Sequence, residues 1–232
     1  MIVLEDLGAA PQIDHILLGE DAAAAESAMT AFVKTLAELH CLTAGHTDRY
    51  DEIRQGLGSR VVRDYTGWIK RFGERMKKEG LASAALSVEL EACRSAFAEP
   101  GPFKVYTHGD PCPDNCLLID GRLHLLDFEW GEVRHALIDG VCPWIHFPSC
   151  WCVNWLPDHL PEQLMHTYRT ALAVGIREAE DDALFGLGLV AACVAGFMKS
   201  YGDDVHEKDS QWGIIDRSTT MRAENPDPGK DG

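Results

Sequence analysis

The chain has 232 residues, of which 46% are hydrophobic, enough for a substantial buried core and too many for an intrinsically disordered protein. The 37 acidic residues outnumber the 21 Lys and Arg and give a formal net charge of −16, which argues against nucleic-acid binding because phosphates require clustered Lys and Arg. No basic leader precedes an apolar run at the N-terminus, so we expect no signal peptide, and the eight cysteines are expected to be reduced thiols of a cytoplasmic protein.

Three amphipathic helices are predicted before residue 100. Apolar side chains recur at helical intervals over residues 26–40, and Asp21 is a suitable start signal for this helix. A second apolar stripe runs over residues 61–78, and a third runs over residues 81–98 and ends before a Pro-Gly-Pro sequence. Such stripes are most simply the faces of helices that pack on a core, so they indicate no function by themselves.

A β-hairpin is predicted in the middle of the chain, after a short strand over residues 104–107. Residues 116–119 and 122–126 have strand-like sequences. The Asp120-Gly121 pair between them favours a two-residue turn, because both central positions of such a turn need a positive φ. Two short antiparallel strands joined by a tight turn are therefore expected here.

The register of this hairpin brings polar side chains together at its open end. A two-residue turn pairs Leu117 with His124 and places Asn115 opposite Leu126. Asn115 and Asp127 therefore emerge at the same end of the hairpin, and we expect them to be neighbours although they are about a dozen residues apart in the sequence.

The polar residues around the hairpin suit phosphoryl transfer. Asp110 lies on the loop that enters the first strand, where it could orient an attacking hydroxyl and accept its proton. Asn115 and Asp127 offer the oxygen ligands that Mg²⁺ prefers. The spacing is that of protein kinases, with a catalytic Asp, an Asn five residues later and a metal-binding Asp before Phe. The alternative that Asp110 and Asn115 merely cap turns leaves the joint spacing unexplained.

Helical patterns return after the hairpin, over residues 136–146, 161–175 and 181–201. The apolar run at residues 183–198 is rich in small side chains and falls short of a membrane span, so we expect a buried helix and no membrane partner. The tail over residues 218–232 contains Pro, Gly and charged residues and is expected to be disordered.

A motif around the hairpin resembles that of the aminoglycoside phosphotransferase and choline kinase family: His108-Gly109-Asp110-x-x-x-x-Asn115, then Asp127-Phe128-Glu129. In this motif, His108 is expected to hydrogen-bond the backbone near Asp127 and so to steady the loop. Residues 36–40 resemble the first helix of the family's larger lobe. Asp139 resembles the Asp that begins the following helix and braces the catalytic loop.

The resemblance implies an α+β, mostly helical fold, namely the larger C-terminal lobe of a protein-kinase-like fold with a small catalytic β-hairpin. Residues 1–8 would form the hinge strand between two lobes, and residues 9–217 would form the C-terminal lobe, with the catalytic loop and hairpin at residues 104–131. The nucleotide, ATP or GTP, would bind with Mg²⁺ and contact three residues of the hinge: Glu5, Asp6 and Leu7.

The smaller N-terminal lobe of the family is missing from this sequence. That lobe carries a glycine-rich loop and a strand Lys that pairs with the nucleotide phosphates, and neither feature is found here. We therefore expect a truncated chain, whose family activity is inferred for the lobe-complete protein and is in question for the chain itself.

The distance between two acidic residues indicates which kind of kinase this is. Only about eleven residues separate Asp127 from Asp139, whereas protein kinases place there a longer segment that holds a peptide and a regulatory phosphate. Gly109 also replaces the Arg that would pair with that phosphate. The acceptor is therefore expected to be the hydroxyl group of a small molecule.

The acidic composition allows a cationic acceptor, but a solvated acidic surface is the favoured explanation, because the acidic excess is spread along the whole chain. Candidate acceptor contacts are Glu129 and Trp130 after the metal-binding Asp and the acidic pair Asp203 and Asp204. Aromatic side chains could form a wall around a choline-like cation, with a packed core as the alternative. These side chains are Trp130, Trp144, Trp151 and Trp155.

Two other functions are weighed against the kinase. A non-catalytic kinase-like remnant would act as a binding protein, and a metal-dependent hydrolase would use Asp110, Asp127 and a His around two metal ions. Structural zinc is not favoured, because neither the Cys112 and Cys116 pair nor the Cys150 and Cys152 pair has the two-residue gap of a zinc knuckle. The sequence leaves the oligomeric state open.

Overall fold

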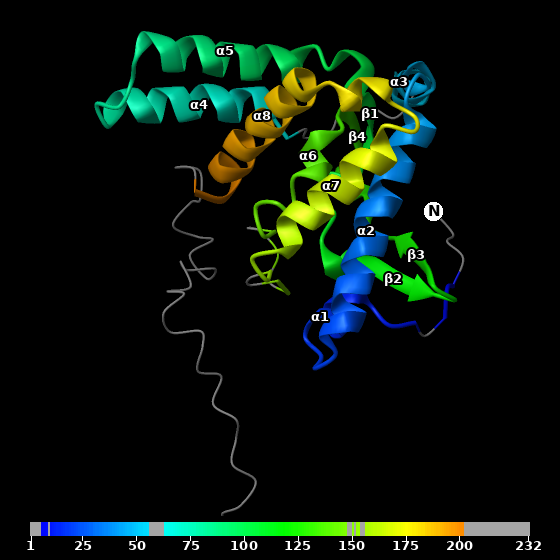
Figure 1. Cartoon of the computed structure of the whole chain (residues 1–232). Coiled ribbons are helices and arrows are strands. Elements are labelled where there is room, and N and C mark those ends of the chain that lie inside the picture. Colours follow the sequence, from blue (N-terminus) through cyan, green and yellow to red (C-terminus); the bar gives the residue numbers. More distant parts are fainter. Residues whose placement is uncertain are drawn as a thin grey trace, which may run out of the picture.

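The computed structural model of the chain describes residues 6–8, 10–55, 63–147, 150, 152–153 and 156–201. Helices form most of it and two small antiparallel sheets complete an α+β fold, as predicted (Figure 1). The helices are α1 (Ile13–Leu17), α2 (Ala22–Thr43), α3 (Thr47–Gln55), α4 (Tyr65–Lys78), α5 (Ala84–Ala98), α6 (Leu137–Gly140), α7 (Leu160–Leu172) and α8 (Asp182–Tyr201). The strands are β1 (Lys104–Thr107), β2 (Cys116–Ile119), β3 (Arg122–Leu125) and β4 (Glu132–His135).

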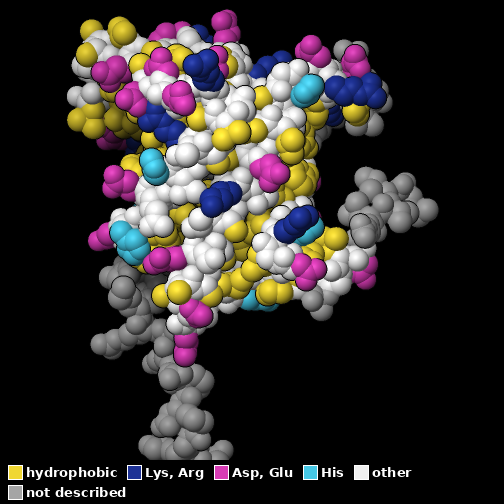
Figure 2. All heavy atoms as spheres, turned by 45° about the vertical axis from the view of Figure 1, so that its right-hand side comes forward, with side chains coloured by type: hydrophobic (Ala, Val, Ile, Leu, Met, Phe, Trp, Pro, Cys, Tyr) yellow, Lys and Arg dark blue, Asp and Glu magenta, His cyan; other side chains and the backbone are white. Residues whose placement is uncertain are grey.

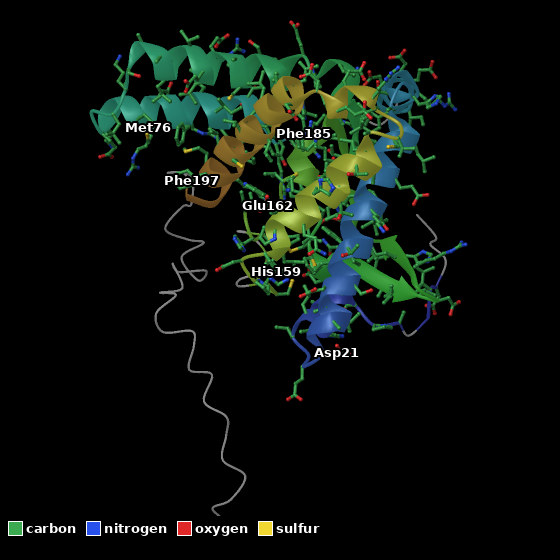
Figure 3. The ribbon with its side chains drawn as sticks, viewed as in Figure 1. Asp21, Met76, His159, Glu162, Phe185 and Phe197 are labelled. Atoms are coloured by element: carbon green, nitrogen blue, oxygen red, sulfur yellow. A yellow bond between two sulfur atoms is a disulfide. The ribbon has the colours of Figure 1, made fainter. Side chains whose placement is uncertain are left out.

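Helices α2 and α7 lie side by side in the centre of the molecule and run in the same direction. Figure 3 places Asp21 and His159 at the same end of the two helices. At that end, His159 Nε2 lies 3.1 Å from Glu26 Oε1, and at the other end the thiol of Cys41 donates to the carbonyl of Leu172 at 3.4 Å. Side chains of both helices reach the start of α6, where His40 Nε2 lies 3.3 Å from Asp139 Oδ2 and the hydroxyl of Tyr168 donates to the carbonyl of Ala136 at 3.3 Å.

Helices α4 and α5 form a second helical layer, crossed by α8 (Figure 1). The ring centroids of Phe72 on α4 and Phe197 on α8 are 6.1 Å apart, and Figure 3 shows Phe197 and Met76 on the same side of this layer. Phe185 and the small residue Ala192 of α8 are buried. This layer brings the C-terminal end of α8 next to the catalytic loop.

Helix α8 has the length and the apolar composition of a membrane-crossing helix, with a mean hydropathy of 1.6 over Asp182–Lys199. The expectation that residues 183–198 fall short of such a span was therefore wrong, because the helix extends over 20 residues. Core helices of soluble proteins pass the same test, and α8 packs against α4, α5 and α6. Of that window, 33% is buried inside the structure, so the packing of α8 is only partly that of a core helix.

The ends of the helices depend on capping side chains. Asp21 accepts a hydrogen bond from Ala24 N at 3.0 Å, which confirms it as the start signal of α2. Helix α4 begins later than predicted, because Asp64 caps it by accepting from Gly67 N at 2.8 Å. Helix α5 likewise begins after its cap Ser83, and α6 ends at Gly140, where the chain turns instead of continuing to residue 146.

The predicted hairpin is present in the predicted register. Leu117 pairs with His124 and Ile119 with Arg122, and Leu126 N donates to the carbonyl of Asn115 at 2.8 Å. The polar strand β4 was missed. It pairs with β1 in antiparallel fashion, Val105 with Arg134, and continues the chain directly from the hairpin toward α6.

Replacing Gly121 by Ala is expected to destabilise the protein by about 1 kcal/mol. Gly121 has a φ of +75°, and a Cβ there would meet no other atom, so the cost comes from the backbone conformation alone. Chemical denaturation at equilibrium would measure it. Gly186→Ala in α8 is the matched control, because a Cβ there also meets nothing but the helical backbone favours Ala by about 1 kcal/mol. A similar sign for both variants would contradict this account.

The segment expected as the hinge strand is described only in part. Residues 1–5, with Glu5, lie outside the described residues, and Asp6 and Leu7 belong to an irregular segment in which Gly8 N donates to Asp6 Oδ1 at 2.8 Å. The chain then runs beside the hairpin, where Leu118 N donates to the carbonyl of Pro11 at 2.9 Å. The tail over residues 218–232 also lies outside the described residues.

Candidate active site

The loop that carries Asp110 is held by a buried carboxylate at the start of α6. Asp139 Oδ2 accepts from His108 N at 2.6 Å, and Asp139 Oδ1 accepts from Gly109 N at 3.0 Å. Gly109 has a φ of +82°, and a Cβ at this position would overlap the carbonyl of Trp130. Asp139 therefore fixes the backbone of the loop that carries Asp110, and only glycine fits at position 109.

Asp139 is in turn fixed by two helices of the central layer. His40 Nε2 lies 3.3 Å from Asp139 Oδ2, and His40 Nδ1 lies 2.8 Å from the hydroxyl of Tyr168. Burial raises the pKa of Asp139, but the hydrogen bond and charge of His40, together with the charges of Arg134 and His108, outweigh it and hold this pKa below its ordinary value. The carboxylate is thus stabilised in its charged form.

A second set of hydrogen bonds joins the loop to the hairpin. His108 Nε2 lies 2.6 Å from the carbonyl of Leu126, as expected for the residue that steadies the loop near Asp127. Asn115 Nδ2 donates to the carbonyl of Asp110 at 3.1 Å. Asp127 follows Leu126 with a φ of +57° and is exposed. These bonds connect the segments that carry Asp110, Asn115 and Asp127 at one end of the hairpin.

Two cations that the sequence did not reveal lie beside Asp110. Arg63 Nη1 is 3.8 Å and Lys199 Nζ is 3.7 Å from Asp110 Oδ1. Arg63 also donates to the carbonyl of Gly109 and lies over the ring of Trp130, 4.1 Å from its centroid. Burial, and then the charge of Arg63, lower the pKa of Lys199 although Asp110 raises it. The carboxylate of Asp110 therefore sits in a locally positive environment.

A pocket opens next to Asp110 between the catalytic loop, the turn after α6 and helix α8. Asp110 and Lys199 are its charged lining residues. Burial raises the pKa of Tyr65 to about 12, despite the nearby charges of Arg134 and Arg63, so its hydroxyl is a neutral hydrogen-bonding group. The other walls are mostly apolar, with Ile138, Val141, Cys142, Ile145, Phe147 and Ala192.

Comparison with known families agrees with this arrangement. The model of the phosphotransferase enzyme family (APH) matches residues 2–175, three quarters of the chain. The chain belongs to the phosphotransferase enzyme family. No curated protein matches it. The match includes the braced loop and the hairpin with Asp110, Asn115 and Asp127, whereas Lys199 beside Asp110 lies beyond the matched segment of this family member.

The candidate acceptor contacts of this phosphotransferase-family chain differ in their exposure and in their neighbours, and some lie outside the described residues. The guanidinium group of Arg63 lies over one face of the Trp130 ring, so a cation already occupies that face. Glu129 is exposed in the turn Phe128–Trp130, and Trp144 is 39% exposed. The residues outside the described parts of the chain are Trp151, Trp155, Asp203 and Asp204. An aromatic wall around a cation therefore stays a prediction, without support from Trp130.

The expectation that all eight cysteines are reduced was wrong for two of them. A disulfide joins Cys112, in the catalytic loop, to Cys150, and the Cα atoms of the two residues are 5.9 Å apart. The other six cysteines are free. The sequence hides this bond, because 38 residues separate the two cysteines and the turn after α6 brings them together.

Charged side chains are dispersed over the face of the molecule that Figure 2 shows. Acidic side chains alternate with Lys, Arg and His on this face, and hydrophobic side chains lie between them. The described ion pairs include helix-surface pairs of Arg75 with Glu79 and of Arg94 with Glu91. On this face the acidic excess is that of a solvated surface.

Proposed function

We propose that this phosphotransferase-family protein transfers the terminal phosphate of ATP or GTP to the hydroxyl group of a small molecule. The supporting observation is the brace of Asp139 on the backbone of His108 and Gly109, which fixes Asp110 beside a pocket and next to the hairpin. Phosphoryl transfer depends mainly on positioning and on charge, and a rigid loop supplies the positioning.

The donor set fits a magnesium ion. The amide nitrogen of Asn115 is used by the carbonyl of Asp110, which leaves its amide oxygen as the atom available to a cation. Asp127 presents an exposed carboxylate at the same end of the hairpin. A bound Mg²⁺ would neutralise charge on the nucleotide phosphates. Asn115 and Asp127 would hold it, and Asp6 and Leu7, with Glu5, would contact the nucleotide.

Asp110 would act as the general base. Its carboxylate lines the pocket, so an acceptor hydroxyl there could donate a hydrogen bond to it. As the hydroxyl oxygen attacks the terminal phosphorus, its proton passes to the Asp110 carboxylate and the bond to the leaving nucleoside diphosphate breaks. Arg63 and Lys199, both within 4 Å of Asp110 Oδ1, add positive charge where the transferred phosphate develops negative charge.

The pocket also favours one class of acceptor. Its walls are apolar apart from Asp110, Lys199 and the hydroxyl of Tyr65, so an apolar alcohol would bury its carbon skeleton there. Two cations beside the base would repel a polycation. We therefore propose a neutral or anionic alcohol with an apolar skeleton, in place of the cationic acceptor that the acidic composition allowed.

An acceptor screen tests this proposal. ADP or GDP release would be measured with Mg²⁺ for apolar alcohols, hydroxy acids, sugars, amino alcohols and aminoglycosides, with the chain and with the longest natural form of the protein. We expect apolar neutral or anionic alcohols to stimulate release at least about tenfold more than aminoglycosides, which corresponds to about 1.4 kcal/mol. A preference for aminoglycosides would refute the acceptor class while leaving the transfer reaction in place.

The alternative is a kinase-like protein that binds a ligand without turnover. Equilibrium binding distinguishes the two functions: a binding protein would hold a ligand in the pocket with no acceptor-stimulated release of ADP or GDP in any form of the protein.

A further inference from the structure

Three cysteines and an aspartate gather beside the loop that carries Asp110. The ligand atoms of Cys112, Asp114 and Cys152 all lie within 4.8 Å of one another. Cys150 is joined to Cys112 by the disulfide and is therefore next to this group. The residues are adjacent in the fold although the spacing of the two cysteine pairs in the sequence gave no such indication.

We propose that, once the disulfide is reduced, Cys112, Cys150, Cys152 and Asp114 bind a zinc ion. Three thiolates and one carboxylate are a set of ligands that suits Zn²⁺, which is held by four sulfur, nitrogen or oxygen atoms in closed structural sites. Ligand atoms of such a site are about 3–4 Å apart, because Zn–S and Zn–O distances are about 2.3 and 2.0 Å. Cys112, Asp114 and Cys152 already lie within 4.8 Å of one another and need only a small contraction, and the thiol of Cys150, freed by reduction, would supply the fourth ligand.

Buried negative charge next to these cysteines also favours a bound cation. Asp14 is 2% exposed, and its Oδ1 has no hydrogen-bond partner among the described residues. The charges of Asp14 and Asp114 both act on Cys152. Among the described ion pairs, the partner of Asp14 is His15 at 3.9 Å, whose side chain is 69% exposed. Buried negative groups are retained when they are paired or when they coordinate a metal.

An ion at this position would have a structural role, because its ligands lie in two segments next to Asp110. Cys112 and Asp114 lie between Asp110 and Asn115 in the catalytic loop, and Cys150 lines the pocket beside Asp110. In a reducing compartment the disulfide that ties these two segments would open. A zinc ion bound by the same side chains would keep these two segments connected. Cys116 is left out, because its thiol donates to the carbonyl of Cys112 at 3.4 Å.

The test uses the full chain and metal ions alone. A trialkylphosphine reduces the disulfide, with one water consumed, and yields the phosphine oxide and two thiols. After removal of the phosphine without air, Co²⁺ is titrated, and Zn²⁺ is then added. We expect one Co²⁺ per chain with thiolate-to-cobalt charge-transfer absorption and the visible bands of a tetrahedral site, and we expect Zn²⁺ to abolish both. Zinc binding should release protons, because thiols must ionise to coordinate.

Substitutions of single residues test which side chains bind the ion. Cys152→Ser and Asp114→Asn should each weaken the affinity for Zn²⁺ at least about tenfold, the lower limit seen even for groups that only support a ligand. Cys193→Ser, on α8, is the matched control and should bind as the parent does. Circular dichroism would show that each variant is folded. The proposal is overturned if the folded, reduced parent shows no thiolate absorption with Co²⁺, or if Cys152→Ser and Cys193→Ser bind zinc equally.

Discussion

Replacing Asp110 by Asn is expected to lower acceptor-stimulated phosphate transfer by about 10²- to 10⁴-fold, the usual contribution of a general base. The change keeps the size of the side chain and removes its ability to take the acceptor proton. The backbone of the loop should stay in place, because its hydrogen bonds come from Asp139 and Asn115 and involve only main-chain atoms of residues 108–110. Binding of Mg²⁺ and nucleotide should therefore be retained.

Asp127→Ala should behave in the opposite way and weaken the binding of Mg²⁺ with the nucleotide itself. Turnover would be measured by ADP release in a form of the protein that transfers phosphate, and binding by isothermal calorimetry. Asp120→Asn is the control for both, because Asp120 is an exposed acid in the turn of the same hairpin and Asn tolerates its φ of +49°. Parental turnover in Asp110→Asn would disprove its assignment as the base.

The parts of the site that could be predicted are those with short-range signals. The Asp120-Gly121 turn sets the register of the hairpin, and the register determines that Asn115 faces Leu126. The expected contact of His108 near Asp127 is confirmed by its bond to the Leu126 carbonyl, and the brace by Asp139 is confirmed as well. That Asn115 and Asp127 share a metal ion stays a prediction.

The parts that were missed depend on the packing of distant elements. Arg63 and Lys199 meet at Asp110 because the α4, α5 and α8 layer packs beside the catalytic loop, and no local pattern distinguishes them from surface cations. Cys112 and Cys150 are joined for the same kind of reason. Strand β4 was missed because Glu132-Val133-Arg134-His135 lacks the apolar alternation of an ordinary strand, and its pairing with β1 decides its structure.

The central helices contribute contacts to the site that neither a motif nor the periodicity of the sequence reveals. His40 occupies a position in the apolar stripe of α2, where a histidine is easily taken for a packed core residue. It lies between the hydroxyl of Tyr168 and the carboxylate of Asp139, all three fully buried. The loop that carries Asp110 is thus held by contacts that run from α7 through α2 to α6. The buried carboxylate of Asp139 ends this series, and its substitution is expected to have the largest effect.

Replacing Asp139 by Asn should therefore cost about 3–5 kcal/mol of stability, the usual effect of breaking a buried charge pair. His108 N and Gly109 N donate to different oxygens of Asp139, and in asparagine an NH2 donor would replace one of these two acceptors. Urea denaturation at pH 7 would measure the loss. Asp182→Asn is the matched control, because this carboxylate is 92% exposed in its pair with Arg169 and should cost about 0–1 kcal/mol.

The pH dependence gives an independent check on the same charge. Because the folded protein holds the pKa of Asp139 below its ordinary value near 3.8, the stabilisation is present above that value and is lost as the pH falls through the lower, folded pKa. The parent should thus lose stability relative to Asp139→Asn as the solution is acidified below about pH 4. Curves that stay parallel in this range, or a cost below about 1 kcal/mol at pH 7, would show that the carboxylate does not carry the brace.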